Sequence, residues 1–182
     1  MPTKLTKFIA AITVQVVVIF AIIIFKYSIL VGGTEVLLKI APVDPRDMLR
    51  GDYATFQYDI SNVDPYSVAG EIKNGDTVYV ALYQGGKYWA IESVRKVQPE
   101  DGSVFIKGKV ESGGSGSSAE SFSIRFMGSR MHIVYGIEQF FIPEGSGRSF
   151  SFFGKESAAR VVIDDNGNAV LKQIYVNDKP WP

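Results

Sequence analysis

The feature that most constrains this chain is an apolar run near its N-terminus. Residues 8–25 contain no charged residue, and only Thr13 and Gln15 interrupt their apolar character. A helix over these 18 residues rises about 1.5 Å per residue and is about 27 Å long, which nearly spans the hydrocarbon core of a membrane. The apolar character continues beyond Lys26, whose ammonium group can extend to the surface, so we predict a membrane-spanning segment over residues 8–30.

The charges that flank this run predict its orientation. Lys4, Lys7 and the amino terminus precede it and Lys26 alone closely follows it, so the positive-inside rule places the N-terminus in the cytoplasm. A cleaved signal peptide usually has an apolar core of about 7–15 residues and a small-x-small site, which residues 27–31 lack. A buried helix of a soluble domain would need a partner surface on all its faces. We therefore expect residues 1–31 to be a retained anchor, with the remaining chain on the outer side.

Residues 34–182 have the pattern of one mainly β domain. Short runs rich in Val, Ile, Tyr, Phe and Thr alternate with clusters of Gly, Asp, Asn and Ser. We predict a single β-barrel or β-sandwich-like domain, joined to the anchor by residues 32–34 as a short flexible joint. Residues 111–120 are mostly Gly and Ser, which predicts a flexible loop inside the domain. The predicted strands are 34–41, 53–60, 77–83, 87–97, 103–110, 121–127, 130–136, 157–163 and 169–176.

A Gly-Gly pair at residues 85–86 marks the clearest predicted hairpin. Such a pair suits the positive φ angles of a two-residue turn. A turn at this position would set Leu82 opposite Trp89 and Val80 opposite Ile91 on one apolar face.

Composition excludes several classes of function. Lys plus Arg number 19 and Asp plus Glu number 19, so no general attraction to nucleic acid is expected. The chain has no cysteine, which excludes disulfides and cysteine nucleophiles. Its one histidine, His132, lies in an apolar stretch, and we interpret it as a structural or exposed strand histidine. Asp44, Asp47, Asp52 and Asp59 are close in sequence, but their spacing fits no known calcium loop, so we predict neither a metal nor a cofactor.

The most distinctive segment is a turn that leads into a strand. Residues 42–52 are rich in Pro and Asp, and Gly51 permits a backbone conformation closed to other residues. Alternation over residues 53–60 then places one set of side chains in the core, namely Ala54, Phe56, Tyr58 and Ile60. The candidate binding residues of this segment are Asp47, Arg50, Gly51, Asp52, Tyr53 and Tyr58.

Residues 51–58, Gly-Asp-Tyr-Ala-Thr-Phe-Gln-Tyr, resemble the signature of the GDYxxLxY family of bacterial membrane-anchored proteins, with Phe56 in place of the usual leucine. Residues 135–145, an aromatic-rich Tyr-Gly…Pro-Glu-Gly stretch, are similar to a second segment of that family and add Glu144 as a candidate. With the anchor, the resemblance covers nearly the whole chain. It implies a single-pass protein of the bacterial inner membrane that has no established activity and accompanies multi-pass membrane proteins.

A weaker architectural likeness is to type I signal peptidases, which use a serine nucleophile and a lysine base. Residues 49–52 and 73–78 each lead into a strand as in that family, and Lys96 offers a base. No serine occurs between Thr34 and Gly51, where that family carries its nucleophile. We therefore predict a non-catalytic binding or accessory module for an integral membrane protein or an envelope component. A membrane-tethered hydrolase is the alternative.

Overall fold

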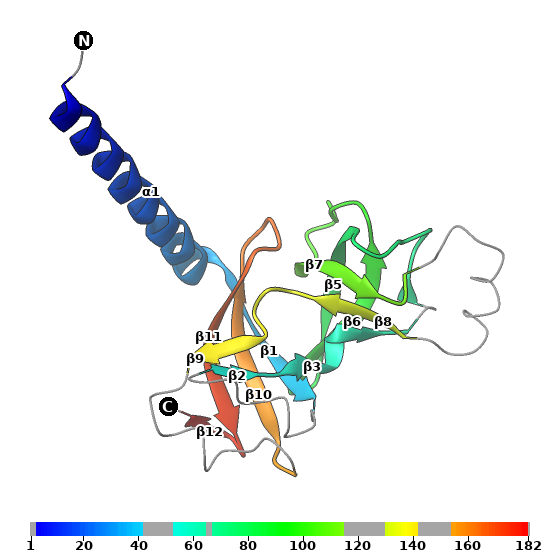
Figure 1. Cartoon of the computed structure of the whole chain (residues 1–182). Coiled ribbons are helices and arrows are strands. Elements are labelled where there is room, and N and C mark those ends of the chain that lie inside the picture. The colour runs from blue at the N-terminus through cyan, green and yellow to red at the C-terminus, as the bar shows by residue number, and fades with distance from the viewer. Residues whose placement is uncertain (1–2, 42–52, 65–66, 115–129, 142–153, 182) are drawn as a thin grey trace.

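An N-terminal helix and a mainly β domain are the two parts of the chain. The computed structural model describes residues 3–41, 53–64, 67–114, 130–141 and 154–181. Helix α1 (Lys4–Gly32) projects away from the strands, so the N-terminus lies far from the domain (Figure 1). The strands are β1 (Thr34–Ala41), β2 (Tyr53–Thr55), β3 (Gln57–Tyr58), β4 (Asn62–Val63), β5 (Thr77–Gly85), β6 (Tyr88–Arg95), β7 (Phe105–Ser112), β8 (Met131–Val134), β9 (Gln139–Phe141), β10 (Ser157–Ile163), β11 (Ala169–Val176) and β12 (Lys179–Trp181).

Helix α1 is long and apolar enough to cross a membrane. It has 29 residues, and an 18-residue window of it has a mean hydropathy of 3.0 with none of its residues buried. The Thr3 hydroxyl caps the helix by accepting a hydrogen bond from the backbone N–H of Thr6, at 3.4 Å. Large apolar side chains such as Phe20 and Ile24 are exposed along it, which a lipid environment tolerates and water does not. The predicted spanning segment, residues 8–30, lies within this helix.

The strands form a nearly closed, barrel-like arrangement around one core. One five-stranded sheet has the order β12-β11-β10-β1-β3, a second has the order β4-β8-β7-β5-β6, and β2 pairs with β9. Residues 34–39 of β1 pair with β10, whereas Ile40 and Ala41 pair with β3. Side chains from both larger sheets, such as Leu38 and Val80, share one buried core. The predicted mainly β, barrel-like domain is confirmed.

Most predicted strands lie near their predicted bounds. The bounds of β1, β10 and β11 agree with the prediction residue for residue, and β5 to β8 overlap their predicted ranges. The predicted loop 111–120 begins too early, because Glu111 and Ser112 are the last residues of β7. Gly114 then donates its backbone N–H to the Asn74 Oδ1 at 2.7 Å. The predicted strand 121–127 lies outside the described residues.

The predicted strand 53–60 divides into two short strands with different partners. β2 pairs with β9, β3 pairs with β1, and a short 3-10 helix (Asp59–Ser61) follows. The predicted core face is confirmed at Phe56, Tyr58 and Ile60, which are all buried. The division falls where the partner strand changes from β9 to β1, and alternation within one segment does not encode its partners.

The predicted register of the β5–β6 hairpin is wrong. Gly85 pairs with Tyr88, so the turn residues are Gly86 and Lys87 rather than 85–86. Gly86 has a φ of 81°, and a two-residue turn with positive φ at its first position needs glycine only there, which leaves Gly85 in the strand. The displaced turn sets Leu82 opposite Ile91 instead of Trp89, and a register shift between Ala81 and Leu82 then sets Val80 opposite Val94 instead of Ile91.

The predicted flexible joint between anchor and domain is also wrong. Gly32 ends α1, and Gly33 caps it by donating its N–H to the Ile29 carbonyl oxygen at 2.9 Å, directly before β1. A Cβ added at Gly33 would lie 2.6 Å from the Ile163 carbonyl oxygen and 2.7 Å from the Val162 Cγ1. The side chain of Ile29 is 1% exposed. Glycine therefore serves close packing of the helix end against β10, not freedom of movement.

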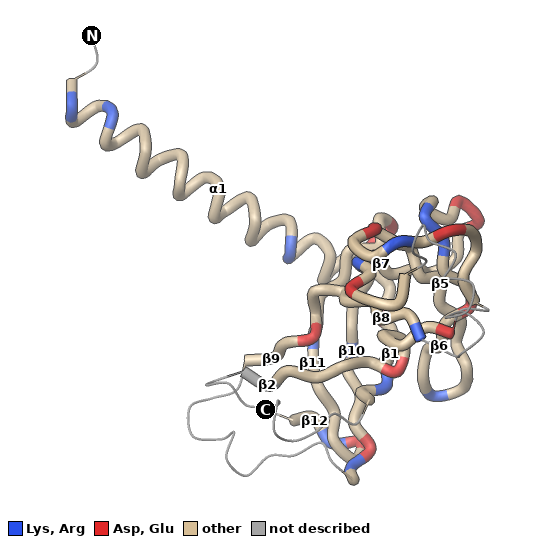
Figure 2. The backbone as a smooth tube through the Cα atoms, turned by 45° about the vertical axis from the view of Figure 1, so that its right-hand side comes forward, with Lys and Arg blue, Asp and Glu red and all other residues tan. Residues whose placement is uncertain are grey.

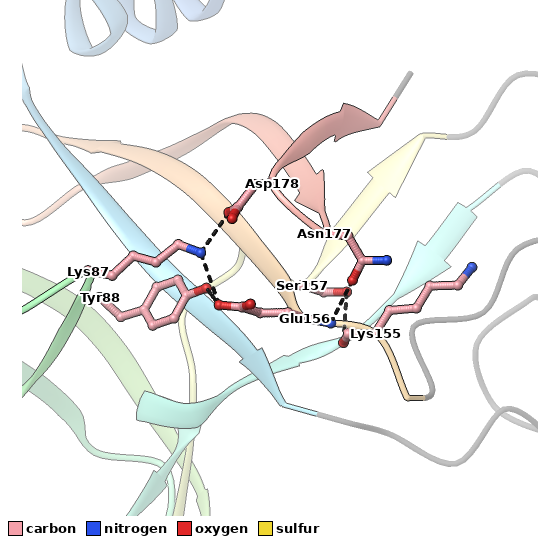
Figure 3. Close-up of polar contacts among 7 residues, drawn as sticks. All are labelled: Lys87, Tyr88, Lys155, Glu156, Ser157, Asn177 and Asp178. Carbon is pink, nitrogen blue, oxygen red and sulfur yellow. Dashed lines mark hydrogen bonds and ion pairs between the residues drawn. The ribbon is translucent and has the colours of Figure 1, made fainter.

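A polar cluster ties the β5–β6 turn to the β11–β12 turn and to the start of β10 (Figure 3). The Lys87 ammonium lies 3.0 Å from Glu156 Oε1 and 2.6 Å from Asp178 Oδ1, and the Tyr88 hydroxyl donates to Glu156 Oε1 at 2.5 Å. The hydrogen bonds from Tyr88 and then from Lys87 hold the pKa of the Glu156 carboxyl below its ordinary value. Asn177 and Asp178 both have positive φ, as a type I′ turn requires. The cluster links the edges of the two larger sheets.

Candidate functional site

The two distinctive sequence segments, residues 51–58 and 135–145, meet in the structure. Strand β2 pairs with β9, with Thr55 opposite Gln139. Directly after β2, the backbone N–H of Phe56 donates to the carbonyl oxygen of residue 138 at 3.0 Å. Segments about eighty residues apart in the sequence therefore form one structural unit, beside the core (Figure 1).

Two buried tyrosines, Tyr58 and Tyr135, hold these segments together. The hydroxyl of each donates a hydrogen bond to a backbone carbonyl oxygen two residues from the other. The Tyr58 hydroxyl donates to the Ile137 carbonyl oxygen at 2.7 Å, and the Tyr135 hydroxyl donates to the Ile60 carbonyl oxygen at 2.6 Å. Burial raises the pKa of both tyrosine hydroxyls, so both remain neutral donors. The side chain of Tyr58 is 0% exposed, so it supports the site from within and does not reach a partner on the surface.

A hydrogen bond between a side chain and the backbone stabilises the turn between β8 and β9. Gly136 has a φ of 77°, a conformation that side chains disfavour. The Glu138 carboxylate then accepts a hydrogen bond from the backbone N–H of Tyr135. The positive φ of Gly136 and this hydrogen bond explain why a Tyr-Gly-x-Glu sequence stands at this position.

A groove opens where the two segments meet, and we name it the motif groove. Its volume is about 440 Å³, within the range of about 300–1,000 Å³ typical of ligand clefts. Most of its lining side chains are polar. The described lining residues are Thr55, Phe56, Gln57, Glu111, His132, Val134, Gly136, Glu138 and Gln139.

His132 lies in this groove with both ring nitrogens near oxygen atoms. Its Nδ1 is 3.1 Å from the Asn62 Oδ1 and its Nε2 is 3.6 Å from the Glu111 Oε2. Asn62 belongs to β4, the strand that pairs with β8, so the contact stabilises this edge of the sheet. Among the described lining residues, Thr55 carries the only aliphatic hydroxyl, and the described contacts of the His132 ring are with Asn62 and Glu111 instead. The described part of the groove therefore contains no arrangement of nucleophile, base and acid.

The structure places few of the candidate residues that the sequence suggested. Asp47, Arg50, Gly51, Asp52 and Glu144 lie outside the described residues. Tyr53 is described through its backbone, which pairs with Phe141. Asp59, one of the four clustered aspartates, forms an ion pair with Lys39 at 3.4 Å. Within the described ranges, no group of three or more His, Asp or Glu is placed to hold a metal ion.

Several residues of the motif groove were missed by sequence reasoning. Gln57 lies on the predicted polar face of its strand, and this signal alone could have identified it. Glu111 was assigned to a flexible loop, and His132 to a structural strand position. Their approach to Gln57 depends on the pairing of β7 with β8 and of β8 with β4, which no local pattern reveals.

Comparison with known proteins identifies one relationship. A family model described as GDYXXLXY protein matches residues 15–174, which extend from α1 to β11. The predicted family resemblance is thereby confirmed. No curated protein and no solved structure matches the chain. The likeness to type I signal peptidases is therefore not supported.

Proposed function

The chain belongs to the GDYXXLXY family, and we propose that it is a single-pass membrane protein whose β domain is a non-catalytic binding module. In this proposal α1 crosses the bacterial inner membrane with its N-terminus in the cytoplasm, as the bias of Lys4 and Lys7 over Lys26 favours. The domain then lies on the outer side, next to the membrane. Its partner is an integral membrane protein that the domain accompanies.

The motif groove is the observation that carries this proposal. The two family segments meet there and contribute polar side chains to its lining, instead of serving the core alone. Glu111 and Gln139 are exposed in it, and Gln57 is half-buried. Carboxylate and amide groups of this kind recognise a partner through hydrogen bonds and charge. The groove therefore suits an extramembrane loop that presents amide or basic groups.

Residues next to the groove in sequence extend the proposed contact. Asp52 and Tyr53 precede β2 or begin it, and Glu144 follows β9 by three residues. Together with Asp47, Arg50 and Gly51, they remain candidates for contact with the partner. Tyr58 contributes by holding the segments together.

Site-specific photo-crosslinking in native membranes tests the proposal. A photoreactive residue at exposed Gln139 is expected to form an adduct with an integral membrane protein, whereas the same residue at exposed Glu100, outside the groove, is not. Glu111→Gln is expected to lower the adduct yield from position 139 by about tenfold, since a lost charged hydrogen bond has this effect on affinity. Glu100→Gln makes the same charge change and should leave the yield intact. Equal yields in the two variants, or adducts with lipid alone, would count against a protein partner.

A further inference from the structure

The packed joint fixes how the domain sits beside the membrane helix. Ile29 is buried and Gly33 leaves no space for a Cβ against β10. Helix α1 therefore continues into β1 without a hinge between them. Whatever surface of the domain lies beside the last turns of α1 is held at a constant height relative to the membrane. This step rests on the membrane anchoring in the proposed function.

A second groove lies at this position, and we name it the anchor groove. It lies between the end of α1, strands β7 and β8, and the turn that joins β10 to β11, with a volume of about 490 Å³. Its lining includes Phe25, Lys26, Lys107, Lys109, Tyr135 and Asn168. The helix contributes one wall and the domain contributes the others, so the groove exists only because the joint is packed.

Three lysines line the anchor groove without a carboxylate partner. Lys26 comes from α1, and Lys107 and Lys109 are exposed positions on β7. No acidic residue is among the described lining residues, and the described residues form no ion pair with any of the three. Lys87 and Lys96, by contrast, each have a carboxylate within 3.0 Å. The only charges along α1 are also basic (Figure 2). Lysines gathered in this way repel one another unless an anion lies between them.

The anchor groove lies at the level where lipid phosphates are found. Lys26 directly follows the uncharged run 8–25, and its ammonium group can extend to the membrane surface near the end of the predicted spanning segment, residues 8–30. Basic side chains at such a boundary attract anionic headgroups electrostatically. Each lysine adds to this attraction, which falls off within a Debye length of the surface. Phe25 supplies an apolar wall on the membrane side of the groove.

We propose that the anchor groove binds the phosphate headgroup of an anionic membrane lipid. Lys107 and Lys109 hold the phosphate from the domain side, and Lys26 holds it from the helix side. The acyl chains remain in the bilayer beside the apolar face of α1. Such a lipid would join the domain to the membrane surface independently of any protein partner.

Lipid binding to the full-length protein in a mild non-ionic detergent tests this proposal. Native mass spectrometry would count the molecules of phosphatidylglycerol or phosphatidylcholine that remain bound during titration with each lipid. The wild-type chain is expected to retain phosphatidylglycerol in preference to phosphatidylcholine. Lys107→Gln combined with Lys109→Gln is expected to weaken phosphatidylglycerol binding by about tenfold or more. An unchanged affinity in this double variant would overturn the proposal.

Two matched variants separate the groove from general charge. Lys39→Gln combined with Lys179→Gln removes the same charge from exposed positions outside the groove and should leave lipid binding intact. Lys107→Arg combined with Lys109→Arg keeps the charge and should retain phosphatidylglycerol. Equal weakening by the Lys39 and Lys179 changes would overturn the assignment to this groove. Circular dichroism should show the same strand content in all variants.

Two further measurements identify the source of the phosphate and test the proposed protein partner separately from the lipid. Inorganic phosphate at millimolar concentration should not displace the lipid, and full displacement would instead assign the groove to a soluble phosphate. The photo-crosslink from position 139 is measured in the same Lys107 and Lys109 variant. A retained crosslink with lost lipid binding supports two separate sites. Lipid binding without any crosslink in the wild type would overturn the protein partner and leave the lipid site standing.

Discussion

The two grooves of the domain share a wall but differ in charge. Val134 and Gly136 line both, since the grooves lie on either side of β8 and the turn that follows it. The exposed face of β7 passes from one groove to the other, with Lys107 and Lys109 in the anchor groove and Glu111 in the motif groove. The balanced composition of the whole chain conceals this separation. One strand therefore presents a basic surface next to the helix and an acidic surface next to the family segments.

The two grooves also depend on different forces. The anchor groove depends on steric packing at Gly33 and Ile29, with little polar contribution. The motif groove depends on hydrogen bonds between buried groups, above all those of Tyr58 and Tyr135. Substitutions that act on one force should leave the other groove intact, which makes the comparison testable.

The largest effect is expected at the helix joint. In Gly33→Ala, the added Cβ would meet backbone and side-chain atoms at 2.6–2.8 Å, so the helix end must shift at a cost of about 1–3 kcal/mol. Gly32→Ala is the matched control, because nothing lies within 4 Å of a Cβ there. Chemical unfolding of the full-length protein in detergent would measure the free energy of unfolding of both variants. Equal stability of the two variants would contradict a packed joint, as would unchanged phosphatidylglycerol binding in Gly33→Ala.

A smaller effect is expected at the motif groove. Tyr58→Phe removes the hydroxyl that donates to the Ile137 carbonyl oxygen and should lower the free energy of unfolding by about 1 kcal/mol. Tyr83→Phe serves as the control, because the Tyr83 side chain is 50% exposed. Urea unfolding followed by tryptophan fluorescence would measure the difference. If the crosslink from position 139 falls while lipid binding stays constant, the two grooves are independent; a parallel loss of both would contradict that separation.

The smallest effect is expected in the polar cluster that touches neither groove. Because the pKa of Glu156 is lowered in the folded state, its contribution is present above the ordinary value of 4.5 and is lost as pH falls through the folded pKa. Glu156→Gln should therefore be less stable than wild type near pH 7, and the difference should shrink below about pH 4.5. Thermal unfolding at a series of pH values checks this. Glu100→Gln is the control. If its stability depends on pH in the same way as that of Glu156→Gln, the polar cluster makes no specific contribution.

Local sequence patterns predicted much of the fold. Runs rich in Val, Ile, Tyr, Phe and Thr between turn-forming clusters placed β1, β10 and β11 at their bounds, and period-two alternation assigned Phe56, Tyr58 and Ile60 to the core. Such patterns work because a strand with one buried face repeats every two residues wherever it lies in the chain. They failed at the β5–β6 turn, where a one-residue displacement of the turn changed every cross-strand pair.

The candidate site was less predictable from sequence. The family segments could be identified, but the groove between them also includes Glu111 and His132, which come from strands paired elsewhere in the sheet. Gly33 illustrates the same limit, because a glycine that permits movement and a glycine that permits close packing look identical in sequence. Only the neighbours at Val162 and Ile163 distinguish the two roles.

The sequence by itself determined that this chain has an apolar helix of membrane-spanning length, a mainly β domain and the signature of its family. Each of these follows from composition or from short-range periodicity, which the chain carries whatever its long-range contacts. The tertiary structure decided that the helix and domain meet without a hinge, that the two family segments pair, and that charges of β7 separate into two grooves. These features depend on contacts between residues far apart in the chain, and such contacts follow from packing and strand pairing.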